Sequence, residues 1–187
     1  VFDRIVNAAK GAALGTGTTM DYEMIGGTHE LLHNETLQRL MHENLETIGG
    51  YSYTQEETAF AEKISESLGI PLDTKYTVGV ESYSSGGKAG GSTDVGDVSF
   101  AVPTVGLRAA TWVPGTPAHS WQAVAAGGTD IGNKGMMVAA KTIALTAMQL
   151  IDNPKIILAA KKEFLQKRGS DFKYVPMLGD RKPALNY

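Results

Sequence analysis

The chain has 187 residues, of which 42% are apolar and 20% are charged, and its net charge is -3. This length is typical of about one domain and is long enough to bury a core. The weak negative charge indicates neither nucleic acid nor an anionic membrane as a partner. The sequence has no cysteine, which excludes a disulfide scaffold and a thiolate metal site.

Targeting and membrane signals are weak throughout the sequence. Lys141 and Gln149 interrupt the longest apolar run, residues 135–151, which stays below the roughly 20 apolar residues that span a bilayer. The first residues carry neither the basic lead nor the apolar stretch of a signal peptide, so we expect a cytoplasmic protein. Because the sequence begins at Val1 inside an amphipathic pattern, we also expect a truncated or processed chain.

The amino-terminal residues predict one helix and one strand. Residues 1–10 place apolar side chains at the spacing of one helix face. Residues 16–25 alternate in the manner of a strand with one exposed side. Because a single helix and strand do not form a domain, we expect them to pack on segments that precede them in a longer chain.

Two helices with recognisable ends are predicted next. Asn34 is the expected N-cap of the first, which ends at Gly49. Thr54 and Glu57 have the spacing of a capping box at the start of the second, which ends at Gly69.

The remaining residues predict strands followed by two helices. Residues 76–83 are weakly strand-like, while residues 102–107 and 109–113 are apolar and predict core strands. Residues 134–151 are apolar on nearly every face, which predicts a helix buried on several sides. Pro154 begins a last helix, and an extended tail follows it.

The densest polar cluster is a glycine-rich loop at residues 90–97. It carries two hydroxyls and two carboxylates, on Ser92, Thr93, Asp94 and Asp97. Glycines allow backbone N–H groups to approach a ligand closely, so the loop is compatible with a binding site and equally with a solvated turn. It is a poor phosphate loop, because Ala89 rather than Ser or Thr follows Lys88.

His119 lies in a second loop, residues 114–121, which two prolines and Gly115 restrict. Loops at strand ends are where α/β enzymes place their chemistry, so His119 is a candidate metal ligand or acid–base group. A lone histidine is more often structural. His29, His33 and His42 have no partner at metal-ligand spacing.

Arg108 lies between the two apolar segments expected to be core strands. A buried arginine needs an acidic partner or an anionic ligand. Two alternatives remain open: Arg108 binds a substrate carboxylate, or it pairs with Asp94 or Asp97. Trp112 and Trp121 flank the His119 loop, and we expect them in the core rather than in a substrate platform.

Two segments carry a resemblance to a known family. Residues 91–104, with Ser92-Thr93-Asp94-Val95-Gly96-Asp97, and residues 114–122, with His119-Ser120-Trp121, resemble the amidohydrolase branch of the M20 metallopeptidases. Weaker matches extend the resemblance over nearly the whole chain.

The resemblance implies an α/β fold. In this family a catalytic domain with a mixed sheet flanked by helices is interrupted by an α+β lid domain that also mediates dimerisation. Residues 1–27 would be the last helix and strand of the lid, and residues 28–187 the carboxyl-terminal part of the zinc-peptidase-like catalytic domain. A homodimer through the lid is therefore expected.

The resemblance also implies metal-dependent hydrolysis of N-acyl amino acids such as aminobenzoyl-glutamate, or of dipeptides. His119 aligns with a metal-ligand histidine, and zinc or manganese is the expected metal. The substrate-binding candidates are Ser92, Thr93, Asp94, Asp97, Arg108 and Gly115. The family's other metal ligands and its general-base glutamate have no counterpart in this sequence, and we expect them upstream of Val1.

Three functional hypotheses follow. The first is part of a metal-dependent amidohydrolase that is inactive without its amino-terminal half. The second is a non-catalytic partner or regulatory protein that retains half of the hydrolase fold. The third, weaker hypothesis is an unrelated small-molecule binder that uses the Gly/Ser-rich loop.

Overall fold

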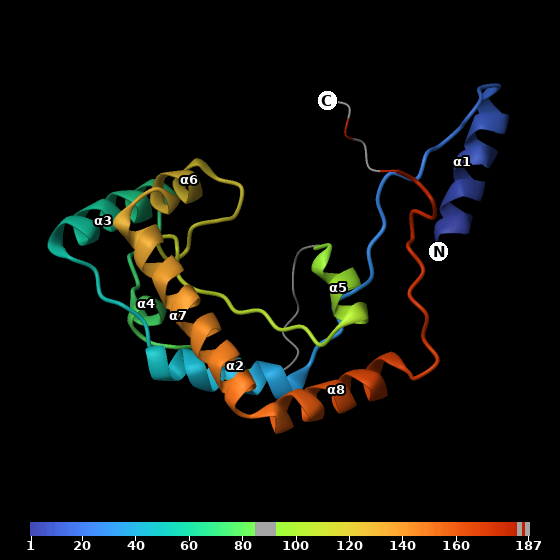
Figure 1. The fold of residues 1–187 in the computed structure, drawn as a ribbon. Coiled ribbons are helices and arrows are strands. Elements are labelled where there is room, and N and C mark those ends of the chain that lie inside the picture. Colours follow the sequence, from blue (N-terminus) through green and yellow to red (C-terminus); the bar gives the residue numbers. More distant parts are fainter. Residues whose placement is uncertain (85–92, 183–184, 186–187) are drawn as a thin grey trace. The chain divides into compact units, whose positions relative to one another are not determined.

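The computed structural model describes residues 1–84, 93–182 and 185 and divides the chain into two compact units (Figure 1). Unit 1 comprises Val1–Thr28 and Lys173–Tyr187, and unit 2 comprises His29–Phe172. This division does not test whether the two parts belong to a lid and a catalytic domain, which stays a prediction.

All regular structure in the described ranges is helical, so the expected α/β fold with a mixed sheet is wrong. Residues 18–25 and 103–111 have neither helix nor strand assignments, and residues 76–83 contain the end of a short helix, α4 (Lys75–Val78). A strand exists only when a neighbour completes its hydrogen-bond ladder. Apolar, β-prone residues therefore do not make a strand where no second strand lies beside them.

Unit 1 contains the predicted amino-terminal helix, α1 (Phe2–Thr16), which ends at Gly17 in the left-handed conformation (φ 67°). None of the residues of α1 is buried. The tail of the chain meets the segment after α1, where Arg181 forms an ion pair with Glu23 at 2.6 Å and donates to the carbonyl of Ile25 at 3.3 Å.

Unit 2 confirms the two predicted helix starts. Asn34 caps α2 (Glu35–Ile48), and its side chain accepts a hydrogen bond from the Leu37 N–H. Thr54 and Glu57 form the expected capping box of α3 (Gln55–Leu68). A short helix, α5 (Val95–Ala101), occupies residues for which a loop was expected.

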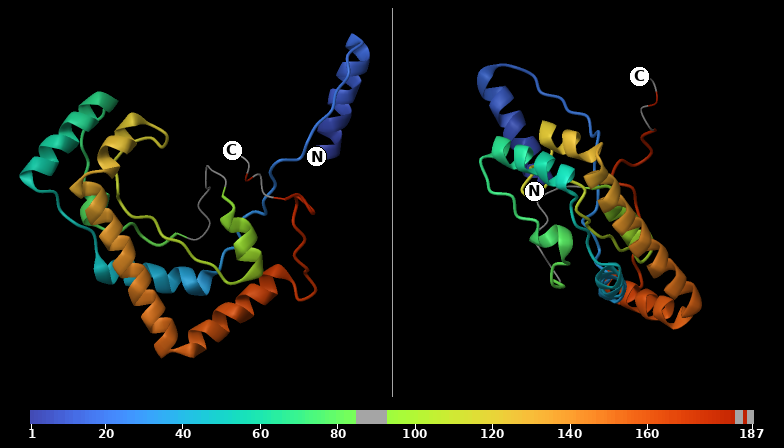
Figure 2. Two further views of the ribbon diagram at one scale, coloured as in Figure 1. Left: turned by 45° about the horizontal axis from the view of Figure 1, so that its top comes forward. Right: turned by 90° about the vertical axis from the view of Figure 1, so that its left-hand side faces the viewer.

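Three further helices complete unit 2: α6 (Trp121–Gly127), α7 (Asp130–Asp152) and α8 (Pro154–Arg168). Figure 2 shows α7 and α8 meeting at a sharp bend, which measures 99°. A small apolar core joins α3, α6 and α7, and its buried members are Ala61, Ile64, Val113, Ala126 and Ile131. Among the described residues no single helix is long and apolar enough to cross a membrane. The bent pair of α7 and α8, taken together, has the length and apolar composition of a membrane-crossing segment.

Polar contacts hold α2 against α7 and α8. The Asn44 side-chain amide donates to Thr146 Oγ1 at 3.0 Å and to Gln149 Oε1 at 2.8 Å, both on α7. The Asn34 amide donates to the Ala160 carbonyl of α8 at 2.8 Å. Buried amides that are satisfied in this way fix the register of three helices, because misplacing any of them would leave polar groups unpaired.

Candidate functional site

The loop that carries His119 is held at both ends. Gly115 has φ 82°, and a β-carbon there would lie 2.2 Å from Cδ1 of Ile70, so both conformation and space favour glycine. Ser120 closes the loop as the N-cap of α6: its hydroxyl donates to the Pro117 carbonyl at 2.7 Å and accepts from the Ala123 N–H at 3.2 Å. The structure therefore gives Gly115 a role in shaping the loop.

His119 itself is exposed and has a left-handed backbone, with φ 60°. Histidine is one of the few residues enriched in this conformation, which is uncommon outside glycine. Its imidazole makes no hydrogen bond or ion pair with any residue that the structure describes. The ring is thus open to a ligand. Trp112 and Trp121 are also exposed, at 38% and 63%, so their expected place in the core is wrong.

The glycine-rich acidic loop is only partly described. Ser92 lies outside the described residues, and Thr93 and Asp94 are exposed at the start of α5, where Thr93 Oγ1 accepts from the Val95 N–H at 3.2 Å. Asp97, unlike Thr93 and Asp94, contacts a residue outside this loop: its Oδ1 lies 2.8 Å from Nδ1 of His29. Its carboxylate therefore joins α5 to the segment at the start of unit 2.

His29 is a residue that sequence reasoning missed. Its ring packs against Phe100 and Phe172, with centroids 4.9 Å and 6.1 Å away. Gly96 allows the close approach, since a β-carbon there would lie 1.9 Å from the His29 carbonyl oxygen. His29 and Asp97 are far apart in sequence and follow no motif, so no local signal could have paired them.

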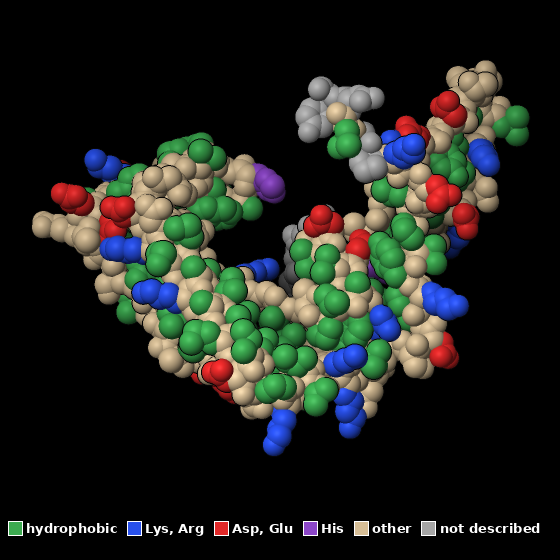
Figure 3. All heavy atoms as spheres, in the orientation of Figure 1, with side chains coloured by type: hydrophobic (Ala, Val, Ile, Leu, Met, Phe, Trp, Pro, Cys, Tyr) green, Lys and Arg blue, Asp and Glu red, His purple; other side chains and the backbone are tan. Residues whose placement is uncertain are grey.

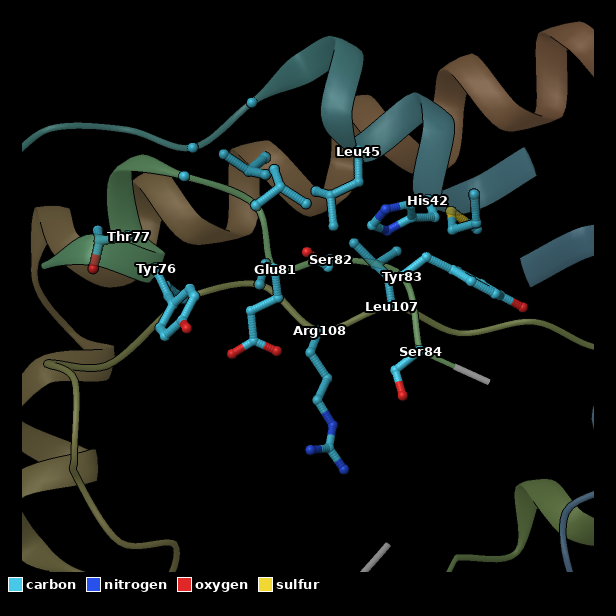
Figure 4. Close-up of a pocket in the computed structure, with 18 of the residues that line it drawn as sticks. His42, Leu45, Tyr76, Thr77, Glu81, Ser82, Tyr83, Ser84, Leu107 and Arg108 are labelled. Carbon is cyan, nitrogen blue, oxygen red and sulfur yellow. The ribbon is translucent and has the colours of Figure 1, made fainter. Parts of the chain in front are cut away.

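Arg108 lines a pocket of about 520 Å³ between α2, residues 76–84 and residues 106–110 (Figure 4). The pocket wall also carries His42, Tyr76, Glu81 and Tyr83. In Figure 4 the side chains of Arg108 and Glu81 extend toward the same open side. The pocket thus presents one cation and one anion beside aromatic rings.

The Arg108 guanidinium is exposed rather than buried, and it makes no ion pair or hydrogen bond with the rest of the described chain. The buried position expected for it is therefore wrong, and no ion pair joins it to Asp94 or Asp97. Tyr83, another residue of the pocket wall, packs against two side chains of α2. The Arg39 guanidinium lies 4.7 Å from the centroid of the Tyr83 ring, and the His42 ring centroid lies 5.4 Å from it.

The structure does not gather the candidate residues into one site. Arg108 lines the pocket, whereas His119, Gly115, Thr93, Asp94 and Asp97 do not. A divalent metal such as zinc needs about three protein ligands, and no group of three His, Asp or Glu side chains that could hold one occurs in residues 1–84, 93–182 and 185. These residues do not fit a complete metal site, so His119 could supply at most one ligand.

Comparisons with known proteins give one relative and no match to a family profile or to a solved structure. The relative is the B subunit of p-aminobenzoyl-glutamate hydrolase from Escherichia coli (strain K12), which is 31% identical over 193 residues. The match covers 89% of this chain but 40% of the relative, so the chain spans about two-fifths of the relative's length. The predicted resemblance to this hydrolase subunit is confirmed, and it extends over part of the relative's length.

Proposed function

We propose that the chain is part of a metal-dependent amidohydrolase that cleaves N-acyl amino acids of the aminobenzoyl-glutamate type, or dipeptides. The observation that carries the proposal is the 31% identity to a hydrolase subunit over 89% of the chain. Since the match covers 40% of that relative, we propose further that this carboxyl-terminal portion is inactive without an amino-terminal half.

His119 is our proposed metal ligand. Its loop is fixed by Gly115 and Ser120, and its ring is exposed with no partner among the described residues. A ligand held on a rigid loop loses little entropy when it binds an ion. Zinc or manganese is the proposed metal, and the remaining ligands and the general-base glutamate would come from polypeptide outside this sequence.

Arg108 is our proposed contact for a substrate carboxylate. The substrates in question carry at least one carboxylate, and a guanidinium is the side chain best suited to bind it with two parallel hydrogen bonds. The pocket beside Arg108 measures about 520 Å³, within the range of small-molecule sites. Thr93, Asp94 and Asp97 stay weaker candidates, and Asp97 already contacts His29.

The proposed partners are the amino-terminal half and a second copy bound through the lid domain. The relative is one named subunit of its hydrolase, which also suggests a different partner subunit. A non-catalytic partner or regulatory protein is the second candidate function. It is favoured by the incomplete set of metal-binding side chains among the described residues.

A chimera tests the proposal. The E. coli relative would receive this chain in place of its matched residues, and p-aminobenzoyl-glutamate hydrolysis would be assayed in the assembled hydrolase with zinc or manganese. We expect activity, and we expect His119→Ala to lower kcat/KM at least about 100-fold, since even residues behind a metal ligand contribute 10–100-fold. His119→Ala should also lower the bound metal.

His33→Ala is the matched control, because His33 is another exposed histidine, whose Nδ1 lies 3.1 Å from the Gln38 side-chain amide. It should leave metal content and kcat/KM unchanged. A soluble chimera in which His119→Ala behaves like His33→Ala would refute the role of His119. A soluble, metal-loaded chimera without hydrolysis would favour the non-catalytic alternative.

A further inference from the structure

The pocket beside Arg108 carries an acidic group that the proposed function does not use (Figure 4). Arg108 and Glu81 are the only Arg, Lys, Asp or Glu side chains among the described residues that line it. Both are exposed, and neither forms an ion pair or a hydrogen bond with another described residue. The pocket therefore offers an unpaired carboxylate as well as an unpaired guanidinium.

Tyr51 holds both segments that carry these charges. Its backbone N–H donates to the Thr77 carbonyl at 2.8 Å, and Thr77 precedes Glu81 by four residues. Its hydroxyl lies 2.6 Å from the carbonyl oxygen of Ala110, which follows Arg108 by two residues. Because one residue anchors both segments, the opening between the two charges is formed before a ligand arrives, which lowers the cost of binding.

The two opposite charges do not neutralise one another. In Figure 4 the side chains of Glu81 and Arg108 extend toward the same open side, yet no ion pair joins them. The neighbouring cation, Lys75, lies 5.0 Å from the centroid of the Tyr76 ring and forms no ion pair with Glu81. Each charge thus stays available to a ligand.

This pair matches a ligand that carries both an ammonium and a carboxylate. The Arg108 guanidinium suits a carboxylate, which it can bind with two parallel hydrogen bonds, and the Glu81 carboxylate accepts hydrogen bonds from an ammonium. Tyr76 lines the pocket on the Glu81 side of Arg108 in Figure 4, is 53% exposed, and adds an aromatic face for the same cation. A ligand that carries carboxylates alone would gain from Arg108 but would be repelled by Glu81.

A large partner of one charge sign is a poorer match. Figure 3 shows basic and acidic side chains interspersed over α3 and α7, without a patch of one sign there. The cavity of about 520 Å³ has the size of a small-molecule site. Recognition in this pocket therefore depends on the local pair of charges rather than on an extended field.

We propose that this pocket binds a small zwitterion, a free amino acid or a short peptide, in preference to an N-acyl amino acid. The proposal rests on the proposed carboxylate contact of Arg108 and adds Glu81 as the group that selects a free amine. Among the substrates proposed above it favours dipeptides, or the amino acid that their hydrolysis releases, over N-acyl amino acids, whose amide nitrogen carries no charge. Binding requires neither metal nor turnover, so the preference can fail while the hydrolase holds.

Two ligands that differ only at the amine test the proposal: L-glutamate and N-acetyl-L-glutamate. Acetylation removes the positive charge and leaves both carboxylates in place. The Kd of each would be measured for the 187-residue chain at pH 7 by chemical-shift titration in NMR. We expect L-glutamate to bind about fivefold more tightly, which corresponds to one exposed ion pair.

Three substitutions locate the effect. Glu81→Gln should weaken L-glutamate and spare N-acetyl-L-glutamate, so that the two Kd values agree within about twofold. Arg108→Gln should weaken both ligands. Because both side chains are exposed, neither change should unfold the chain. Glu62→Gln, which alters an exposed glutamate on α3 outside the pocket, is the control and should change neither Kd.

Glycyl-L-glutamate separates the two sources of the zwitterion. Tighter binding of this dipeptide than of L-glutamate would identify a peptide ligand, and the reverse would identify the released amino acid. Three results would overturn the proposal: N-acetyl-L-glutamate binding as tightly as L-glutamate, a preference that Glu81→Gln retains, or no saturable shift with any of the three ligands. In the first two cases weaker binding by Arg108→Gln would leave the carboxylate contact standing, and hydrolysis by the chimera tests the proposed hydrolase separately.

Discussion

Glu163 on α8 should be a main electrostatic contributor to the stability of unit 2. Its carboxylate accepts hydrogen bonds from the backbone N–H groups of Glu35 and Thr36, at 2.6 Å and 2.9 Å, and from the Thr36 hydroxyl at 2.7 Å. Lys167 donates to it at 2.7 Å. The backbone donors are the first free N–H groups of α2, where the helix dipole favours a negative charge.

These contacts lower the pKa of Glu163 from its ordinary value of 4.5 to about 2. Partial burial alone would raise the pKa, but the hydrogen bonds from Lys167, Thr36 and Glu35 outweigh it. At about 1.4 kcal/mol per pKa unit, the difference corresponds to about 3 kcal/mol of folding free energy. The Glu163 side chain is 18% exposed, so solvent screening reduces this figure only modestly.

Glu163→Gln should therefore lower the free energy of unfolding by about 2–3 kcal/mol at pH 7, as measured by urea denaturation followed by circular dichroism. Because the folded-state pKa lies below the unfolded one, the contribution is complete above about pH 5.5 and is lost as the pH falls toward 2. The wild type and Glu163→Gln should thus converge as the pH falls from about 5 toward 2. Glu62→Gln, an exposed glutamate on α3, is the control and should change little. A constant difference at all pH values, or none at pH 7, would show that the Glu163 carboxylate does not stabilise unit 2 through its charge.

Three further substitutions test the local packing of unit 2 by the same denaturation assay. Thr54→Ala removes the capping-box hydroxyl and should lower stability by about 1 kcal/mol, whereas Thr54→Ser should retain it; equal losses would count against the cap. Tyr51→Phe removes the hydroxyl that lies 2.6 Å from the Ala110 carbonyl oxygen, and a loss of about 1–2 kcal/mol is expected; no loss would mean that water replaces the contact. Gly96→Ala places a methyl group against the backbone of His29, so it should lower stability by at least about 1–3 kcal/mol, and a neutral result would contradict the close packing of α5.

The sequence predicted best those features that depend on neighbouring residues. Asn34, Thr54 and Pro154 mark helix starts because a cap forms within one turn of the residue that begins it. The expected strands failed, because a strand depends on a partner far along the chain or outside it. Residues 103–111 are apolar and β-prone, yet they have no strand beside them among the described residues.

The candidate site shows the same limit. The local restraints of the His119 loop could be predicted from its prolines and Gly115, and the relationship to a hydrolase subunit confirmed the motif-based resemblance. The contact of Asp97 with His29 and the exposure of Arg108 depend on tertiary packing, which no spacing encodes. The helix predicted at residues 134–151 is present in α7, but its expected burial on several sides is wrong, because Met136, Ile143 and Met148 are exposed. An apolar helix looks the same in sequence whether or not its faces are covered.

Release of p-aminobenzoate from p-aminobenzoyl-glutamate is the most direct test of the proposed hydrolase. It should be measured for the chain alone and for the soluble chimera with the E. coli relative, each loaded with zinc or manganese. We expect no release by the chain alone and metal-dependent release by the chimera. Release by the chain alone, or a folded and metal-loaded chimera that releases nothing, would contradict the proposed function.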